Sequence, residues 1–373
     1  SMNEFKRIVK EDPKELTAYL TIRPLVSENK EYEKIQKIIA QAWTKRRYFK
    51  AKCDEKLHRH LSFDSSALSL EPDLKESPGT MRDFHNSEWI LNYCFGLSSF
   101  KEIRSSDDFK EDFNSVVISY KFIKTLRYAT NICTKNKNRL NFESQIDIAK
   151  QAITKNLNYK DKVELVMKSF YFHVQNILSF NEMVSQIFNE QSSIGIKRKK
   201  GSFFVKNNQI GFLDLDLSID NRELIFDIFI ELGKHKKINE INSKSISALK
   251  KSNKLINNSF KQDRVISKKF IQILKSEQNL SSILRTMKNV GVLQSYIPDF
   301  AEIVGQMQFD LFHIYTVDEH TFKVMRSMRQ MKITYSDEFK LENELIRKIP
   351  KIEILYIAGL FHDLGKGKGG NHS

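Results

Sequence analysis

Glycine and proline are scarce in this chain, which has 13 glycines and six prolines among its 373 residues. That is well under half of the usual share of about 12%. All-β sandwiches and barrels need frequent turns, and glycine and proline supply most of them. Apolar residues instead recur at helical spacing, for example at Ile35, Ile38, Ile39 and Trp43. The sequence therefore predicts a mainly α-helical protein of two or three domains.

One segment breaks the helical pattern. Residues 202–217 alternate apolar and polar side chains around Asn207 and Asn208, and this alternation predicts a small β-hairpin. A polar, basic stretch at 191–201 precedes it and is expected to be a loop. Before this stretch, apolar residues at helical spacing predict a long helix over 164–188. The hairpin should therefore lie between helical regions.

The chain is basic, with a net charge of +15. Such a charge suits nucleic acid, nucleotide phosphates or an acidic partner. The lysines are spread along the whole sequence, however, and the compact basic block is short, at 197–200. A lysine-rich composition explains this distribution better than a nucleic-acid site does, so nucleic acid is not an expected partner.

Three features bear on where the protein works. No apolar run approaches the roughly 18 residues needed to cross a bilayer, and the first residues do not resemble a signal peptide. Cys53, Cys94 and Cys133 are odd in number and too widely spaced for a disulfide framework or a CxxC zinc site. We therefore expect a soluble, cytoplasmic protein without membrane contact.

The strongest chemical signal lies near the end of the sequence. His320 falls on an expected helix over 318–331, and His362 and Asp363 end an apolar helix over 350–361. Imidazoles and carboxylates are ligands for first-row divalent metals. If the two helices pack together, these three side chains can converge on one metal. Such a metal lowers the pKa of a bound water and orients it on a phosphorus centre.

A structural alternative exists for the same residues. His320 could be a core histidine, and His362 with Asp363 could simply end a helix and interact with its dipole. The histidine distribution favours the metal site, because His313, His320, His362 and His372 place four of the nine histidines in the last 61 residues. We therefore predict a metal site here.

Four segments resemble known proteins. The motif HDLGK at 362–366, after an apolar helix and an upstream histidine, resembles the HD superfamily of metal-dependent phosphohydrolases. The segments 303–321 and 355–373 closely resemble the bifunctional PII uridylyltransferase/uridylyl-removing enzymes, the nitrogen sensors of bacteria. The segments 70–84 and 289–310 resemble further blocks of that family, so the resemblance extends over most of the chain.

The resemblance implies a mainly α fold: a helical bundle and a truncated all-α HD domain, with a small β-hairpin and the tail of an α/β nucleotidyltransferase domain. The implied parts are a nucleotidyltransferase remnant at 1–65, a helical bundle at 66–193, a basic loop and β-hairpin at 194–220, a helical connector at 221–302 and the first part of an HD domain at 303–373.

The resemblance also implies an activity. The family transfers UMP from UTP to a tyrosine of a PII protein when glutamine is low, and its HD domain removes that UMP when glutamine is high. By this resemblance His320, His362 and Asp363 would be ligands of a divalent metal, Mg²⁺ or Mn²⁺, with His372 as a further ligand. His362, Asp363 and Lys366 would carry the catalysis, Lys366 by contacting phosphate.

Parts of the family pattern are missing from the chain. A nucleotidyltransferase needs a Gly-Ser loop and a nearby Asp-x-Asp for two Mg²⁺ ions, and neither precedes residue 70. The one Asp-x-Asp, at 214–216, falls in the expected hairpin region. A later HD-domain aspartate and the ACT domains that sense glutamine would lie beyond residue 373. We therefore expect a central fragment with both active sites incomplete.

The block 70–84 has two readings. Lys75 and Arg82 could reach the phosphates of UTP, with Gly79 allowing close approach of the backbone. Alternatively, Pro78 and Gly79 form a turn, and Arg82 belongs to an ordinary charge pair at a helix start. The sequence leaves both open.

Two rival functions also remain. An RNA or tRNA nucleotidyltransferase with an HD domain, or another HD phosphohydrolase, would suit the basic charge. A helical regulatory module with a purely structural His-Asp cluster would need no catalysis. A steep loss of binding between about 50 and 200 mM salt would identify the RNA enzyme, and the absence of bound metal would favour the module.

Overall fold

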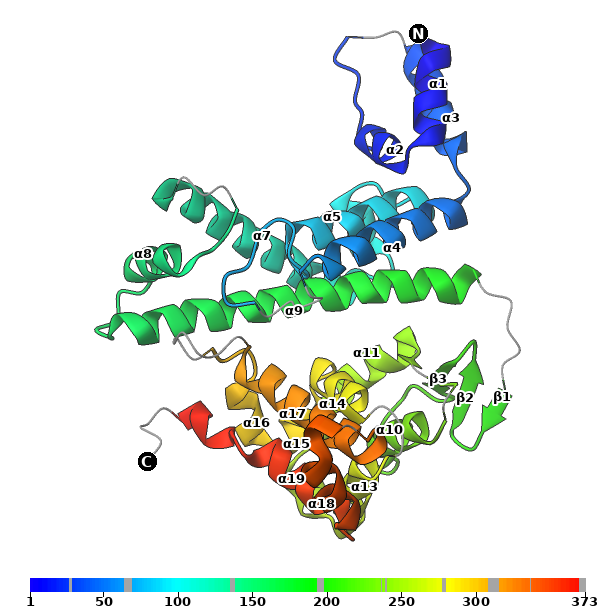
Figure 1. Ribbon diagram of the computed structural model, residues 1–373. Helices are drawn as coiled ribbons and strands as arrows, with labels where there is room; N and C mark the ends of the chain where they lie inside the picture. The colour runs from blue at the N-terminus through cyan, green and yellow to red at the C-terminus, as the bar shows by residue number, and fades with distance from the viewer. Residues whose placement is uncertain are drawn as a thin grey trace. The chain divides into compact units, whose positions relative to one another are not determined.

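The computed structural model of the protein describes residues 1–26, 29–63, 69–134, 138–192, 198–235, 237–238, 240–276, 280–307, 315–335 and 337–368. The fold is mainly α with a small sheet, as predicted. The chain divides into two compact units, unit 1 over Ser1–Ser192 and unit 2 over Ser193–Ser373 (Figure 1). The finer five-part division stays a prediction.

Unit 1 is helical throughout its described residues. Its elements are α1 (Met2–Glu11), α2 (Pro13–Tyr19), α3 (Asn29–Ala42), α4 (Lys45–Leu61), α5 (Met81–Ile90), the π-helical turn η1 (Leu91–Phe95), α6 (Phe100–Ser105), α7 (Lys110–Cys133), α8 (Phe142–Ala152) and α9 (Tyr159–Ser192).

Helix α9 is the central helix of unit 1, on which several other helices pack. Its 34 residues span about 51 Å, and it packs against α5, α7 and α8 (Figure 1). Val163, Met167, Phe170, Val174 and Ile177 recur every three or four residues and are fully buried on one face. This periodic apolar stripe explains why the predicted helix over 164–188 forms. The observed helix is longer at both ends, where its added residues are mostly exposed.

A turn before α5 is built around one buried carboxylate. Asp83 is fully buried and pairs with Arg59, while His60 Nε2 lies 3.0 Å from both carboxylate oxygens. The backbone N–H of Gly79 donates to Asp83 Oδ2 at 2.6 Å. Gly79 has φ +77°, and a Cβ there would lie 2.5 Å from Val174 Cγ1 and 2.7 Å from its carbonyl oxygen.

Gly79→Ala is therefore expected to destabilise unit 1 by at least about 2 kcal/mol, because it adds left-handed backbone strain to an overlap with α9. Urea unfolding would measure the loss. Gly96→Ala is the matched control, since Gly96 has φ +74° but no atom within 4 Å of an added Cβ. Equal losses in the two variants would show that the contact with Val174 is unimportant.

Unit 2 combines a small sheet with helices. Its elements are β1 (Arg198–Lys200), β2 (Phe203–Lys206), β3 (Gln209–Phe212), α10 (Leu224–Lys234), β4 (Glu240–Ile241), α11 (Ser243–Ser252), η2 (Asn253–Leu255), α12 (Asn258–Gln262), α13 (Arg264–Leu274), α14 (Leu280–Asn289), α15 (Val292–Tyr296), α16 (Pro298–Ile303), α17 (Val317–Ile333), η3 (Asp337–Phe339), α18 (Lys340–Lys348), α19 (Ile352–Phe361) and η4 (Leu364–Lys368).

The predicted hairpin is confirmed, but the sheet is larger than expected. Strands β2 and β3 are antiparallel and meet at Asn207 and Asn208, whose φ angles of 51° and 65° match a type I′ turn. Strand β1, in the basic stretch predicted as a loop, pairs with β2, and β4 pairs in parallel with β3. The loop prediction for Arg198–Lys200 is therefore wrong, because backbone pairing at a sheet edge tolerates basic side chains.

The helices of unit 2 share one apolar core that places α17 beside α19 (Figure 1). Gly359 of α19 faces Met328 of α17, and a Cβ on this glycine would lie 2.9 Å from the Met328 sulfur. The missing side chain lets the two helices approach closely. Helix α17 also packs on α14, and α19 packs on α13.

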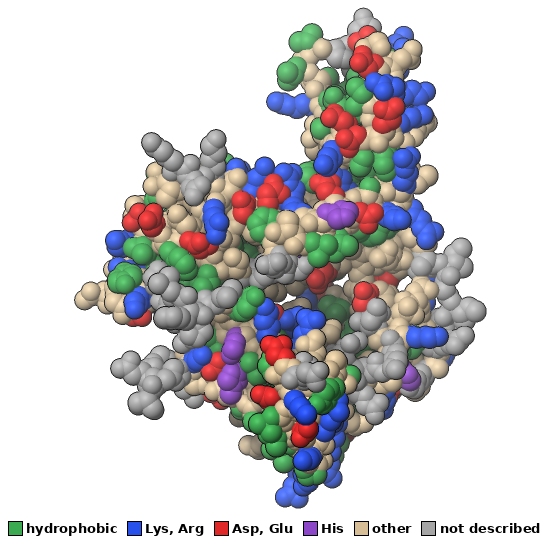
Figure 2. All heavy atoms as spheres, viewed as in Figure 1, with side chains coloured by type: hydrophobic (Ala, Val, Ile, Leu, Met, Phe, Trp, Pro, Cys, Tyr) green, Lys and Arg blue, Asp and Glu red, His purple; other side chains and the backbone are tan. Residues whose placement is uncertain are grey.

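The described helices and the surface drawn in Figure 2 bear on membrane crossing and on the distribution of charge. Among the described helices, none combines the length and the apolar character that crossing a bilayer requires. On the face drawn in Figure 2, Lys and Arg side chains are scattered among acidic, apolar and uncharged ones. The basic net charge is thus not gathered into one large patch on that face.

Candidate metal centre

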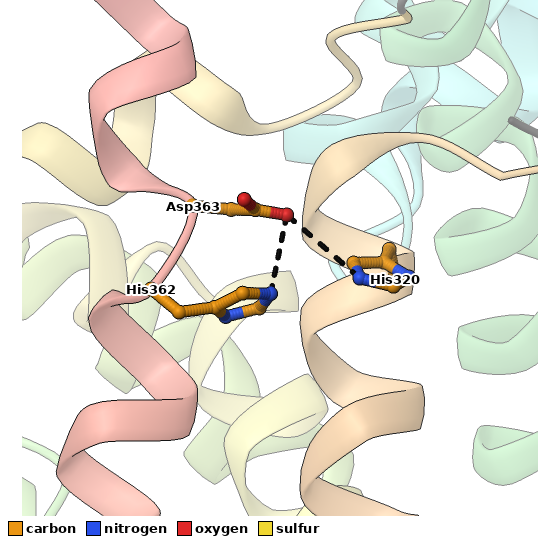
Figure 3. Close-up of side chains that lie close together, drawn as sticks. All are labelled: His320, His362 and Asp363. Atoms are coloured by element: carbon orange, nitrogen blue, oxygen red, sulfur yellow. Dashed lines mark ion pairs between the residues drawn. The ribbon is translucent and has the colours of Figure 1, made fainter. Parts of the chain in front are cut away.

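His320, His362 and Asp363 lie together in unit 2, as expected if the two helices that carry them pack together (Figure 3). His320 is in the first turn of α17, and the other two residues follow the end of α19. Asp363 Oδ2 lies 3.2 Å from His362 Nε2 and 3.8 Å from His320 Nε2. Among the described residues, these three form the cluster of potential metal ligands, with ligand atoms within 4.8 Å of one another.

The cluster is open to solvent on its histidine side. The side chains of His320 and His362 are 46% and 34% exposed, whereas that of Asp363 is 12% exposed. A core histidine would be buried, so this exposure argues against the structural alternative for His320. A metal ion or a phosphate ester can reach the imidazoles directly.

A backbone contact sets the tautomer of His362. Its Nδ1 lies 2.8 Å from the carbonyl oxygen of Gly359. A carbonyl oxygen can only accept a hydrogen bond, so Nδ1 carries the proton in the neutral ring. The lone pair is then on Nε2, the atom that faces Asp363. Such backbone contacts commonly orient metal-binding histidines.

Lys366 also contacts the cluster. Its ammonium group donates to Asp363 Oδ2 at 3.0 Å, and its backbone carbonyl accepts a hydrogen bond of 2.8 Å from Gln306 Nε2. Lys366 therefore lies beside the candidate metal ligands, while its contact with phosphate and its role in catalysis stay predictions. The predicted ligand His372 lies outside the described residues, as does His313.

A buried ion pair anchors the start of α17. Asp318 is 1% exposed and accepts hydrogen bonds from Lys288 Nζ at 3.0 Å and from the N–H of Gly305 at 3.1 Å. The lysine side chain is 5% exposed. This pair holds α17 against α14 two residues before His320. This ion pair was not predicted from the sequence, although Lys288 falls on the apolar face of α14, four residues after Leu284.

The two predicted UTP contacts are paired within their own turn. Lys75 Nζ lies 3.4 Å from Glu76 Oε1, and Arg82 lies 3.0 Å from the same oxygen. The guanidinium of Arg82 also lies 5.6 Å from the ring centroid of Trp89. Both residues belong to unit 1. Their contact with UTP stays a prediction. The alternative, in which Pro78 and Gly79 form a turn and Arg82 belongs to a charge pair, agrees with the Gly79–Asp83 hydrogen bond and the Arg82–Glu76 ion pair.

The Asp-x-Asp at 214–216 is an exposed turn. Asp214 Oδ1 accepts the N–H of Asp216 at 3.0 Å. The cluster of potential metal ligands in the described residues does not include either aspartate. The donors of His320, His362 and Asp363 are, by contrast, the nitrogen and oxygen atoms that Mn²⁺, Fe²⁺ and Zn²⁺ accept. These three residues therefore fit a divalent metal.

Comparison with known proteins decides the family. Two family models match, GlnD PII-uridylyltransferase over residues 47–185 and the third domain of uridylyltransferase GlnD over 203–296. The bifunctional uridylyltransferase/uridylyl-removing enzyme of Nitrosococcus oceani is 31% identical over 99% of this chain. The chain belongs to the PII-uridylyltransferase family. An enzyme of the same description from Pseudomonas aeruginosa is 31% identical over 90% of the chain.

The chain spans about two fifths of the length of these relatives, 43% of the Nitrosococcus enzyme and 38% of the Pseudomonas enzyme. No solved structure gave a significant match. The family models match both units and stop before the metal cluster, whereas the match to the Nitrosococcus enzyme covers nearly the whole chain. These matches favour the PII-uridylyltransferase family over the family of the RNA-enzyme alternative.

Proposed function

We propose that this protein reversibly uridylylates a PII signalling protein, and that unit 2 contributes to removal of the UMP group. The supporting observation is the convergence of His320, His362 and Asp363 in a chain whose relatives are named uridylyl-removing enzymes. The forward reaction would transfer UMP from UTP to a tyrosine of PII. The reverse reaction would hydrolyse the phosphodiester bond that links UMP to that tyrosine.

Within the proposed site, three residues would hold a metal ion, and two others would orient a ligand or contact the substrate. His320 Nε2, His362 Nε2 and Asp363 Oδ2 would hold a divalent ion, Mg²⁺ or Mn²⁺. Such an ion, when bound, lowers the pKa of a coordinated water and polarises a phosphoryl oxygen. The carbonyl of Gly359 accepts the proton of Nδ1 in a hydrogen bond, which keeps Nε2 of the neutral His362 ring unprotonated. The Lys366 ammonium, 3.0 Å from Asp363, would bring positive charge close to the phosphate oxygens of the substrate.

The proposed activity also bears on where the protein works and on which molecules it binds. A cytoplasmic location suits an enzyme that acts on nucleotides and a soluble signalling protein. Glutamine would be the signal that sets the balance between addition and removal of UMP. Lys75 and Arg82 would contact UTP only after release from Glu76, which both now contact. Nucleic acid has no part in this proposal.

The decisive experiment measures UMP release from uridylylated PII by the intact protein with Mn²⁺. The parent protein should release UMP, and the variant His362→Ala/Asp363→Ala should fall to background because two of the three proposed ligands are lost. The matched control is His58→Ala/Asp54→Ala, which removes an exposed histidine and aspartate from α4. Release by the double variant at the parent's rate would refute the site. Failure of the parent to add or to release UMP would refute the function.

A further inference from the structure

We propose that unit 2 carries a second ligand site, an arginine-lined pocket between α14 and α17 that binds a small phosphate-bearing molecule. The pocket has a volume of about 370 Å³. Its polar walls include three arginines and two serines, which are Arg285, Arg326, Arg329, Ser281 and Ser282. This volume falls in the range of pockets that bind small molecules.

The charge of the pocket is one-sided. Three guanidinium groups line it, and the described residues contribute no carboxylate to its lining. Arg285 is neutralised by Glu319, with which it forms an ion pair. Arg326 and Arg329, in contrast, form no ion pair with a carboxylate in the described part of the chain. Among the described residues, two guanidinium groups of this concave site therefore have no carboxylate partner and can pair with an anion.

The lining chemistry identifies the class of that anion. Guanidinium groups present planar forks of N–H donors that match phosphate oxygens in bidentate fashion. The hydroxyls of Ser281 and Ser282 add neutral donors from the first turn of α14, and Leu280 and Ile333 add apolar walls. Arginines with both hydroxyl donors and apolar walls suit a phosphate ester whose organic part is partly apolar.

The pocket is distinct from the metal centre. Arg329 follows His320 by nine residues on α17, which corresponds to about 13 Å along the helix and roughly half a turn around it. Arg326 lies on the same side of the helix as Arg329, not on that of His320. Arg285 connects the two sites, because its partner Glu319 immediately precedes His320.

Calorimetric titration of the full chain with inorganic pyrophosphate, and separately with UMP, tests the proposal. Both titrations use about 50 mM salt and EDTA, so that no metal recruits the ligand to the histidine cluster. The parent should show saturable binding of at least one ligand at one site. Tighter binding of UMP would identify a nucleotide, and tighter binding of pyrophosphate would identify a free phosphate compound.

The variant Arg326→Gln should weaken this binding about tenfold or more, as expected for loss of a charge-assisted contact. Arg326 is exposed, so the fold should be unaffected. Arg264→Gln, which removes an exposed arginine from the start of α13, should leave the affinity unchanged, and so should His362→Ala. The proposal is overturned if the parent binds neither ligand, if Arg264→Gln weakens binding as much as Arg326→Gln, or if His362→Ala abolishes it.

Discussion

Replacement of Lys288 by methionine is expected to destabilise unit 2 by about 3–5 kcal/mol, because it leaves the carboxylate of Asp318 buried without its counter-charge. The two side chains are 5% and 1% exposed, and Nζ lies 3.0 Å from Oδ2. The N–H of Gly305 would remain as a partner of the carboxylate, but one neutral donor cannot compensate a buried charge. Because Asp318 lies two residues before His320 on α17, we expect this substitution also to loosen the part of the helix that carries His320.

The two tryptophans allow the unfolding of unit 1 to be followed by itself. Trp43 and Trp89 both belong to unit 1, so tryptophan fluorescence reports unit 1, whereas far-ultraviolet circular dichroism reports both units. In urea unfolding, Lys288→Met should shift the unfolding of unit 2, which circular dichroism detects and tryptophan fluorescence does not, to a lower urea concentration. The double variant Lys288→Met/Asp318→Asn should recover part of the loss, since it also removes the stranded charge.

A matched control is Lys268→Met, at an exposed lysine of α13. Surface substitutions of this kind usually change stability by no more than about 0.5 kcal/mol. If Lys288→Met were no more destabilising than Lys268→Met, the ion pair would not be anchoring α17. If the double variant were as unstable as Lys288→Met, the loss would come from packing of the lysine stem rather than from charge.

Asp83→Asn is expected to destabilise unit 1 by about 3 kcal/mol, because it removes the charge that partners Arg59 in a buried site. Asp83 is fully buried, while the side chains of Arg59 and His60 are 12% and 16% exposed. The substitution retains the shape of the side chain, so packing against α9 should persist. Tryptophan fluorescence during urea unfolding would measure the loss in unit 1.

The same residue predicts a pH dependence. Burial alone would raise the pKa of Asp83, but the hydrogen bond from His60 and the positive charge of Arg59 outweigh it and hold this pKa below its ordinary value. The unfolded chain therefore takes up this proton at a higher pH than the folded chain. The stabilisation is complete above the ordinary aspartate pKa of about 3.9 and is lost as the pH falls below it.

The stability difference between the parent and Asp83→Asn should accordingly shrink as the pH falls below about 4. Asp54→Ala, at an exposed position of α4, should show neither the loss nor its pH dependence. A difference that persists undiminished at pH 3 would contradict the electrostatic explanation. It would point instead to the geometry of the Gly79 turn as the source of the effect.

Much of the fold could be predicted because the relevant signals are local. The stripe on α9 follows from apolar spacing, and the turn between β2 and β3 follows from two asparagines that tolerate positive φ. Strand β1 could not be predicted in this way, since its residues Arg198, Lys199 and Lys200 have no alternation of apolar and polar side chains. Pairing with β2 alone makes it a strand.

The site shows the same division. His320, His362 and Asp363 were recognisable because their residue types and positions at helix ends suit metal chemistry. The ion pair beneath them was not, because Lys288 and Asp318 are 30 residues apart and resemble ordinary surface charges in the sequence. The pocket around Arg326 and Arg329 was likewise invisible, since its arginines come from two helices.

The amino-acid sequence thus specified the helices, the hairpin and the candidate metal ligands, because these depend on side-chain chemistry and short-range periodicity. Tertiary packing decided which polar side chains became buried partners and which remained free. Asp83 and Asp318 are ordinary aspartates in the sequence, and they became structural only where helices closed over them. The physical reason is that the cost of burying a charge, and the partner that offsets it, exist only once distant elements have come together.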